Sequence, residues 1–204
     1  MSKFEIQAPF KPTGDQPAAI KLLIKGLEQG SHAQTLLGVT GSGKTLPAEF
    51  AIEHFVAQGK KVIYTSPIKA LSNQKFHEFS KKFPNISFGI LTGDIKFNPE
   101  ADVLIMTTEI LRNTLLQKNT NNQSVPLQFE MDFENELACV IFDEVHEYCS
   151  KSRKTIYNMT QSRYMLGLSA TPTRKDGLTY VFKYFLGDTV YSEAQNEDKT
   201  MAVQ

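Results

Sequence analysis

Residues 38–45 and residues 143–146 carry side chains whose types and spacing fit phosphate chemistry. The first segment reads GVTGSGKT, the spacing of a phosphate-binding loop. In such a loop backbone N–H groups turn toward the β-phosphate, Lys44 reaches the β- and γ-phosphate oxygens, and Thr45 is a ligand of Mg²⁺. The other positions expected to line the nucleotide are Gly38, Thr40, Gly41, Ser42 and Gly43.

The second segment supplies the carboxylates that phosphoryl transfer requires. The apolar run 138–142 leads directly into DEVH at 143–146. A strand that ends in two carboxylates can place Asp143 against Mg²⁺ and Glu144 against the attacking water. A glycine-rich turn beside an unrelated acidic helix start is the weaker interpretation, since the first segment also lies between an apolar stretch and a helix-like run. Together the segments predict a site for ATP and Mg²⁺, with Lys44, Asp143 and Glu144 as catalytic residues.

The composition limits the class of protein. The chain has 204 residues with 41% hydrophobic content, enough for one sizeable core, so we expect a single domain over residues 1–204. Its 22 basic and 22 acidic residues cancel, so any contact with nucleic acid must come from local groups. No apolar run approaches the roughly 18 residues of a membrane span, and the N-terminus has no apolar signal core. We expect an intracellular protein, cytoplasmic or nuclear, with Cys139 packed in the core.

Short apolar runs alternate with stretches of helical period. The expected strands are 33–37, 61–65, 87–91, 103–107, 138–142, 164–169 and 189–191. The expected helices are one that Asp15 caps and that ends near Gly30, one over 48–57, one over 69–82 and a short one over 154–161. Strands that are apolar nearly throughout, joined by helical crossovers, predict an α/β fold with a mostly parallel sheet of about seven strands and helices on both faces.

The polar segments follow these strands. Because ligands of parallel sheets bind at the carboxyl ends of the strands, we expect these segments to converge on one edge. They are residues 38–45, 66–67, 92–94, 107–109, 143–144 and 169–171.

These motifs, with the SAT sequence at 169–171, resemble the first RecA-like domain of superfamily 2 DExH helicases, over nearly the whole chain. Different parts resemble different branches. Residues 10–17 and 34–41 are similar to the start of UvrB-type excision-repair proteins. Residues 64–75, 91–94, 106–112 and 140–146 are similar to the exosome-associated Ski2-like RNA helicases. Residues 168–178 are similar to XPB-type and viral translocases. The subfamily therefore stays open, and an engineered or reconstructed sequence is one interpretation of the mixture.

The resemblance implies further roles. Gln16 would read the adenine edge through its amide, and Phe10 would pack against the base. Ser169 and Thr171 would couple the nucleotide site to nucleic acid. His146 would join them by a hydrogen bond toward the 169–171 segment, whereas a structural zinc is not expected, because the other histidines lack ligand spacing.

The expected partner is single-stranded RNA or DNA, held through its phosphates with little sequence preference. Solvated helix faces are the alternative interpretation for Lys69 and Arg112. The candidate contact residues share a position at a strand end or in a helix that follows one; they are Ser66, Pro67, Lys69, Gln74, Gly93, Thr107, Thr108 and Arg112.

Two segments depart from the family pattern. Pro47 is tolerable only if it lies within the start of the helix that follows the phosphate loop, and it is expected to loosen that loop. Residues 119–136, rich in Asn and Gln, read as an exposed insertion.

Helicases of this class place ATP between two RecA-like domains, and arginines of the second accelerate transfer roughly a thousandfold or more. The sequence stops at Gln204, so we expect the second domain to be absent, hydrolysis to be slow and unwinding to be weak. The alternatives are a nucleotide-gated RNA- or DNA-binding module that does not unwind, and a RecA-like fold without function.

Overall fold

The computed structural model describes residues 16–37, 45–120, 129, 131–149, 155–160, 162–169, 179–187 and 189–192. No helix within these ranges is long and apolar enough to cross a membrane. The strands of this part of the chain are β1 (Ala33–Leu37), β2 (Lys61–Ser66), β3 (Phe88–Leu91), β4 (Lys96–Phe97), β5 (Val103–Thr107), β6 (Leu137–Phe142), β7 (Tyr164–Ser169) and β8 (Thr189–Ser192).

The helices connect these strands. They are α1 (Gln16–Glu28), α2 (Thr45–Val56), α3 (Lys69–Lys82), α4 (Thr108–Thr120), the 3₁₀ helix η1 (Val145–Cys149), α5 (Thr155–Met159) and α6 (Thr179–Leu186). The expected helix over 69–82 has the bounds of α3. The helices α4 and α6 were not among the expected ranges.

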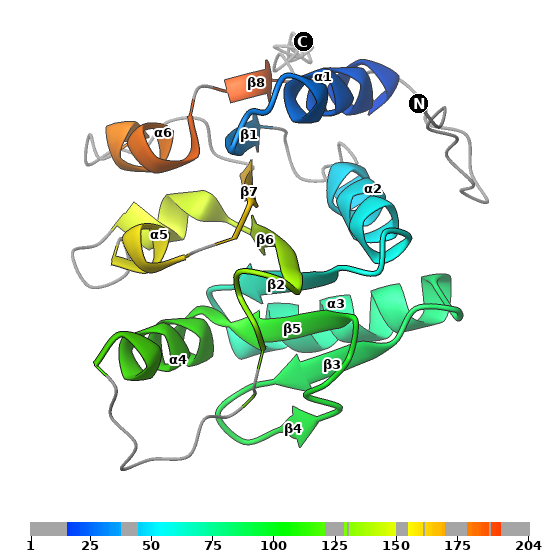
Figure 1. Cartoon of the computed structure of the whole chain (residues 1–204), viewed down its shortest axis with the longest axis vertical. Helices are drawn as coiled ribbons and strands as arrows, with labels where there is room; N and C mark the ends of the chain where they lie inside the picture. The colour runs from blue at the N-terminus through cyan, green and yellow to red at the C-terminus, as the bar shows by residue number, and fades with distance from the viewer. Residues whose placement is uncertain are drawn as a thin grey trace, which may run out of the picture.

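One sheet in the order β4-β3-β5-β2-β6-β7-β1-β8 runs through the molecule (Figure 1). Every pairing is parallel except that of β4 with β3. The predicted parallel sheet and its seven strands are therefore confirmed, with bounds that differ by at most one residue. The two-residue strand β4 was not predicted, because Lys96 and Phe97 are too few to show a period.

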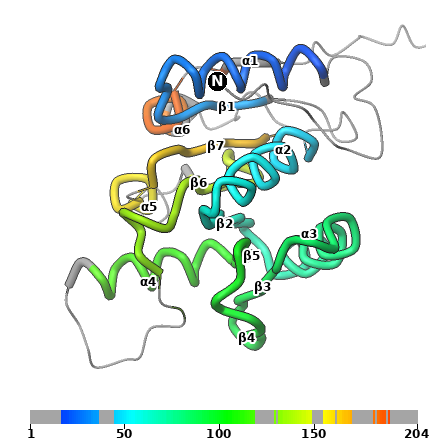
Figure 2. Tube along the Cα trace, turned by 45° about the vertical axis from the view of Figure 1, so that its right-hand side comes forward, coloured from blue at the N-terminus to red at the C-terminus, as the bar shows by residue number. Residues whose placement is uncertain are grey.

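The sheet is covered on both faces, as its apolar strands require. Neighbouring residues of β2 point to opposite faces, with Ile63 in one hydrophobic cluster and Val62 and Tyr64 in the other. Side chains of α4, η1, α5 and α6 belong to the first cluster, and those of α1, α2 and α3 to the second. Figure 2 shows α4 and α5 on one side of the strands and α2 and α3 on the other. This arrangement fixes the strand ends, where the polar segments lie.

The connection between α4 and β6 corrects the sequence prediction. Helix α4 continues to Thr120, and the described residues Phe129, Met131 and Phe133 are 2%, 5% and 5% exposed. The prediction of an exposed insertion over 119–136 is therefore wrong for this part, because these apolar side chains complete the cluster beneath α4. The many Asn and Gln residues of this segment led the sequence analysis to overlook these three apolar residues.

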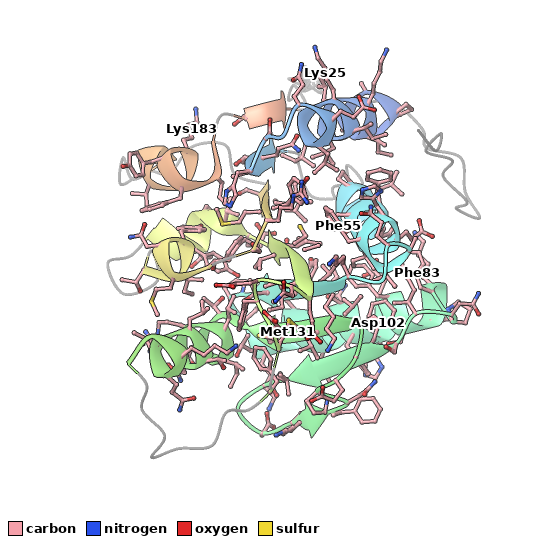
Figure 3. The ribbon with its side chains drawn as sticks, viewed as in Figure 1. Lys25, Phe55, Phe83, Asp102, Met131 and Lys183 are labelled. Carbon is pink, nitrogen blue, oxygen red and sulfur yellow. The ribbon has the colours of Figure 1, made fainter. Side chains whose placement is uncertain are left out.

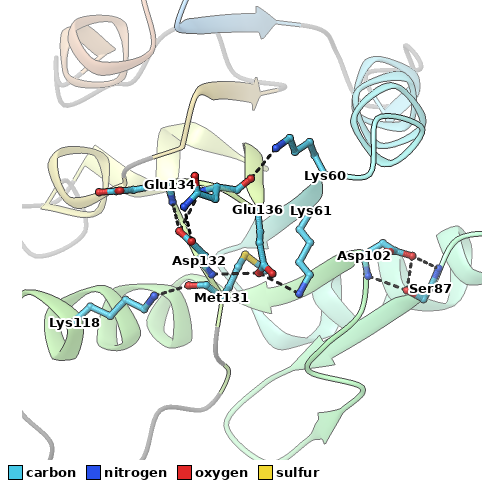
Figure 4. A network of polar contacts seen from close by, with 10 residues as sticks. Lys60, Lys61, Ser87, Asp102, Lys118, Met131, Asp132, Glu134 and Glu136 are labelled. Atoms are coloured by element: carbon cyan, nitrogen blue, oxygen red, sulfur yellow. Dashed lines mark hydrogen bonds and ion pairs between the residues drawn. The ribbon is translucent and has the colours of Figure 1, made fainter.

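Polar contacts hold the same connection at the amino ends of the strands (Figure 4). The Lys60 ammonium donates to the carbonyl of Asn135 at 2.8 Å, and Lys61 lies 3.4 Å from the carboxylate of Glu136. Lys118 donates to the carbonyl of Met131 at 2.6 Å. These contacts fasten the connection to α4 and to the amino ends of β2 and β6.

Pro47 is the third residue of α2 and is buried. The first four N–H groups of a helix have no partner within it, so a proline here removes no helical hydrogen bond. The expectation that Pro47 lies within the helix start is confirmed. Its expected effect on residues 38–44 falls outside the described residues.

Cys139 lies in β6 and is 2% exposed, which confirms that it packs in the core. Burial raises the pKa of its thiol.

Candidate nucleotide-binding site

The carboxyl ends of β1, β7, β6 and β2 lie side by side at one edge of the sheet. Ser169 is the register partner of Leu37, the residue that precedes the predicted phosphate loop. Phe142, which precedes Asp143, pairs with Thr65 of β2. The expected convergence of the strand ends is therefore confirmed for the described segments.

Asp143 is held in place on both sides of its carboxylate. Its Oδ2 accepts a 2.6 Å hydrogen bond from the Tyr64 hydroxyl, and its Oδ1 accepts one of 3.0 Å from the backbone N–H of Glu144. Its own N–H donates to the carbonyl of Thr65 at 2.9 Å. The side chain is almost buried, at 7% exposure. Fixed donors of this kind orient a metal-binding carboxylate before the metal arrives.

Glu144 has a left-handed backbone with φ of 51°. A non-glycine residue in this region is uncommon, and such strain persists only where neighbours enforce it. One contact involves the Glu144 backbone itself, and a second fastens η1 to the end of β2. The N–H of Glu147 donates to the Glu144 carbonyl at 2.9 Å, and the Tyr148 hydroxyl donates to the carbonyl of Thr65 at 3.0 Å. The turn therefore fixes the direction in which the Glu144 carboxylate leaves the strand.

Gly167 allows η1 to approach β7 closely. A Cβ at this position would lie 2.9 Å from Val145 Cγ1 and 2.7 Å from Leu186 Cδ1. A larger residue would have to displace these two side chains, so the glycine favours the close packing of the turn after β6 against β7.

His146 joins the ends of β6 and β7. Its Nδ1 lies 2.9 Å from Ser169 Oγ and 3.4 Å from Glu144 Oε2, and its Nε2 lies 3.5 Å from Glu147 Oε1. The hydrogen bond that we expected between His146 and the 169–171 segment is present. Its function in coupling stays a prediction.

The described oxygen donors fit Mg²⁺. Thr45 begins α2 with a hydroxyl, and Asp143 offers a carboxylate at the same edge of the sheet. Hard oxygen ligands of this kind, few in number and supplemented by substrate phosphates, are what Mg²⁺ takes in nucleotide sites. In the structure the Thr45 hydroxyl accepts a 3.0 Å hydrogen bond from the Lys75 ammonium.

Several predicted site residues lie outside the described residues. Phe10, Thr171 and the loop residues Gly38, Thr40, Gly41, Ser42, Gly43 and Lys44 are among them. Gln16 begins α1, but its side chain is not described. Their roles stay predictions.

Ser66, Thr107 and Thr108 are three of the residues predicted to contact nucleic acid. All three residues are buried, at 0%, 9% and 3% exposure. The Ser66 hydroxyl is 2.7 Å from that of Ser72, and the Thr108 hydroxyl donates to the Ser66 carbonyl at 3.0 Å. These contacts tie the ends of β2 and β5 to α3 and α4, so the hydroxyls hold the strand ends in place.

The remaining nucleic-acid candidates are at or near the surface. Lys69, Gln74 and Gly93 are exposed, and Pro67 and Arg112 are half-buried. Lys69 forms an ion pair with Asp94, and this hydrogen bond lowers the pKa of the Asp94 carboxyl. The guanidinium of Arg112 lies 3.4 Å from the Asn113 side-chain oxygen. These five residues, and Ser66, Thr107 and Thr108, stay candidates for binding phosphates.

Three residues of the site escaped the sequence analysis. Tyr64 and Ser72 support Asp143 and Ser66, and Lys75 contacts Thr45. Each lies in a segment already quoted for its resemblance, 64–75. A tyrosine in an apolar strand and a lysine in a helix have ordinary structural explanations, so only their contacts identify them.

A scan against protein-family models matches residues 13–177 to the family described as DEAD/DEAH box helicase. The chain is 39% identical over 168 residues to the antiviral helicase SKI2 of Saccharomyces cerevisiae, which covers 80% of this chain and 12% of that protein. It is also 39% identical over 163 residues to the chloroplastic DExH-box ATP-dependent RNA helicase DExH15 of Arabidopsis thaliana, covering 78% of this chain and 13% of that protein. The chain thus spans about an eighth of the length of these relatives.

Solved structures share the fold. The SWI2/SNF2 ATPase core of Sulfolobus solfataricus, in complex with dsDNA, matches with a TM-score of 0.62 and 18% identity over 92% of this chain and 38% of that one. The Hef helicase domain of Pyrococcus furiosus matches with a TM-score of 0.62 and 22% identity over 84% of this chain and 37% of that one.

Proposed function

We propose that this chain, which belongs to the DEAD/DEAH box helicase family, is a motor domain that couples the binding and hydrolysis of ATP to the binding of single-stranded nucleic acid. It is a helicase ATPase domain with a RecA-like fold, and the coupling is the part that we infer. The observation that carries the proposal is the hydrogen bond between His146 and Ser169, since it connects the turn that contains Asp143 and Glu144 to the neighbouring strand end.

Each residue has a definite task in this proposal. Thr45 and Asp143 supply oxygen ligands to Mg²⁺, and Tyr64 keeps the Asp143 carboxylate oriented. Glu144 orients the attacking water, from the direction that its left-handed backbone sets. Mg²⁺ held by these residues would supply positive charge to stabilise the transferring phosphoryl group. Lys44 and the backbone N–H groups of residues 38–44 would hold the phosphates.

We propose residues 1–204 as one ATP-binding domain. The relatives are about eight times longer than the matched region, and a helicase of this class completes its ATP site with a second RecA-like domain. Hydrolysis by this chain alone is therefore proposed to be slow and unwinding weak. Single-stranded RNA is the first choice of partner, because the DExH15 relative is named an RNA helicase, and DNA is the comparison.

The test is the affinity of the purified chain for a short, mixed-sequence single-stranded RNA, with and without a non-hydrolysable ATP analogue and Mg²⁺. We expect the analogue to change the affinity several-fold. Lys44→Ala removes the change, because the analogue no longer binds. Lys183→Ala is the matched control, since Lys183 projects from α6 away from the sheet and should behave as the wild type (Figure 3).

Two further measurements complete this test. Ser169→Ala should bind the analogue like the wild type but lose its effect on RNA affinity, because the link to His146 is missing. In separate samples that contain ATP in place of the analogue, ATP turnover should stay low when RNA is added. An RNA affinity that does not respond to the analogue in the wild type would contradict the proposal.

A further inference from the structure

Lys75 has an unusual position for a lysine on an amphipathic helix. It lies in α3, and its side chain is only 11% exposed. The ammonium donates to the Thr45 hydroxyl at 3.0 Å and to the Glu78 carboxylate at 2.9 Å. It also lies 5.6 Å from the centroid of the Phe79 ring. A long cationic side chain, which would ordinarily extend into solvent, is thus held against Thr45, the first residue of α2.

The contact with Thr45 matters because Thr45 is the proposed metal ligand. A hydroxyl oxygen has two acceptor lone pairs, and an ammonium can only donate, so Lys75 occupies one of them. A metal ion bound to the same oxygen would lie a few ångströms from a second positive charge. Like charges at that distance repel, most strongly where burial limits screening. The Lys75 ammonium and Mg²⁺ therefore disfavour each other at the Thr45 hydroxyl.

Glu78 provides the alternative position for the ammonium. It lies one turn further along α3, and its carboxylate is already within 2.9 Å of Lys75. Lys75 can therefore leave Thr45 without exposing an unpaired charge. The charge of the Glu78 carboxylate also reduces the repulsion that Mg²⁺ meets.

Helix α3 carries this contact toward the strand ends. Ser72, three residues before Lys75, is bonded to Ser66 at the end of β2. Phe79, on which the Lys75 ammonium lies, packs edge-on against Tyr64 with centroids 5.4 Å apart. Tyr64 in turn binds Asp143. Residues of β2 and α3 therefore contact both proposed metal ligands, Thr45 and Asp143. The same two elements meet at Ser66, a predicted contact residue for nucleic acid.

We infer that Lys75 is a positioning residue whose ammonium donates to both the Thr45 hydroxyl and Glu78, and that it keeps only the Glu78 contact when Mg²⁺ binds that hydroxyl. When Lys75 leaves Thr45, the position of α3 changes with the binding of metal. The contact between Ser72 and Ser66 passes this change to the end of β2. This inference rests on the proposed function, since it requires Thr45 to be a metal ligand.

The test is the Mg²⁺ concentration that gives half-maximal binding of a fluorescent ATP analogue, measured in the wild type, Lys75→Met and Glu78→Gln. Lys75→Met keeps the apolar stem and removes the charge, so the required Mg²⁺ concentration should fall about threefold to tenfold, the effect of removing one partly solvated like charge. Glu78→Gln removes the alternative partner, so the required concentration should rise by a similar factor. Lys81→Met, an exposed lysine of the same helix, should behave as the wild type.

The outcomes separate the two proposals. If the wild type does not bind the analogue in the presence of Mg²⁺, the proposed function fails and this inference fails with it. If the wild type binds but Lys75→Met matches Lys81→Met, or needs more Mg²⁺, only the inference is overturned. Should Lys75→Met not fold, Glu78→Gln decides alone, because an unchanged or lower Mg²⁺ requirement in that variant contradicts the displacement.

Discussion

Tyr64 is the residue that fixes Asp143 most directly. Its hydroxyl is buried and donates to the carboxylate at 2.6 Å. Burial, and then the charge of Asp143 and the hydrogen bond to it, raise the pKa of Tyr64 well above its usual value. The folded protein therefore keeps this proton at a pH where the unfolded chain, with a tyrosine pKa of about 10, has lost it. The stability that Tyr64 contributes is present below about pH 10 and is lost as the pH rises, by ~1.4 kcal/mol per pH unit.

Replacement of Tyr64 by phenylalanine tests this account. At neutral pH we expect Tyr64→Phe to lower the free energy of unfolding by ~1–3 kcal/mol, because a buried carboxylate loses a donor. Above about pH 10 the stability of the variant should fall less steeply than that of the wild type, by ~1.4 kcal/mol per unit. The measurement is urea unfolding at several pH values.

Tyr184→Phe is the matched control, because Tyr184 is 82% exposed. Its free energy of unfolding should fall with rising pH as steeply as that of the wild type. The raised pKa of Cys139 affects all three proteins equally and does not disturb the comparison. Equal alkaline slopes for the two variants would show that Tyr64 is not held as described.

Sequence reasoning at this scale predicted a set of candidate site residues but not the residues that support them. The phosphate loop and the DEVH segment follow a fixed spacing, and the contact from His146 to Ser169 was expected from the resemblance. Tyr64 and Lys75 have no such spacing, since their significance comes from tertiary contacts across 79 and 30 residues of sequence. The burial of Ser66 and Thr108 was missed for the same reason, because a hydroxyl at a strand end can face either a ligand or a packed helix.

The elements were predicted well where a period was present. Strands such as β5, with all five residues buried, and the long helix α3 stand out from the sequence. The connection between α4 and β6 did not, because Asn and Gln dominate it. The overlooked signal is the alternate spacing of Phe129, Met131 and Phe133, which marks a segment with one buried face.

Phe129→Ala tests whether this connection belongs to the core. Phe129 is 2% exposed and packs against Phe133 at a centroid distance of 6.2 Å. We expect the substitution to lower the free energy of unfolding by ~3–5 kcal/mol, the usual cost of truncating a buried phenylalanine. Chemical denaturation gives the value.

Phe97→Ala is the same substitution at a residue that is 56% exposed, and it should cost less than ~1 kcal/mol. A similar small cost for Phe129→Ala would mean that the segment is peripheral, as the sequence suggested.

At the scale of the whole molecule, the strand order determines what the sequence motifs can do together. Segments separated by about a hundred residues in the chain become neighbours because β1, β7 and β6 are adjacent. The ion pair of Lys61 with Glu136 lies at the amino edge of the sheet, while the carboxyl edge holds Asp143, His146 and Ser169. The residues to which we assign functions therefore gather at the carboxyl edge.

Calorimetric titration of the purified chain with a non-hydrolysable ATP analogue, with and without Mg²⁺, tests the central claim that this edge binds ATP through a metal. The wild type should bind more tightly with Mg²⁺. Lys44→Ala should weaken binding about tenfold or more, because a charged hydrogen bond to the phosphates is lost. Asp143→Asn should abolish the advantage that Mg²⁺ gives. Binding that is indifferent to Mg²⁺ in the wild type, or unchanged in Lys44→Ala, would contradict the account.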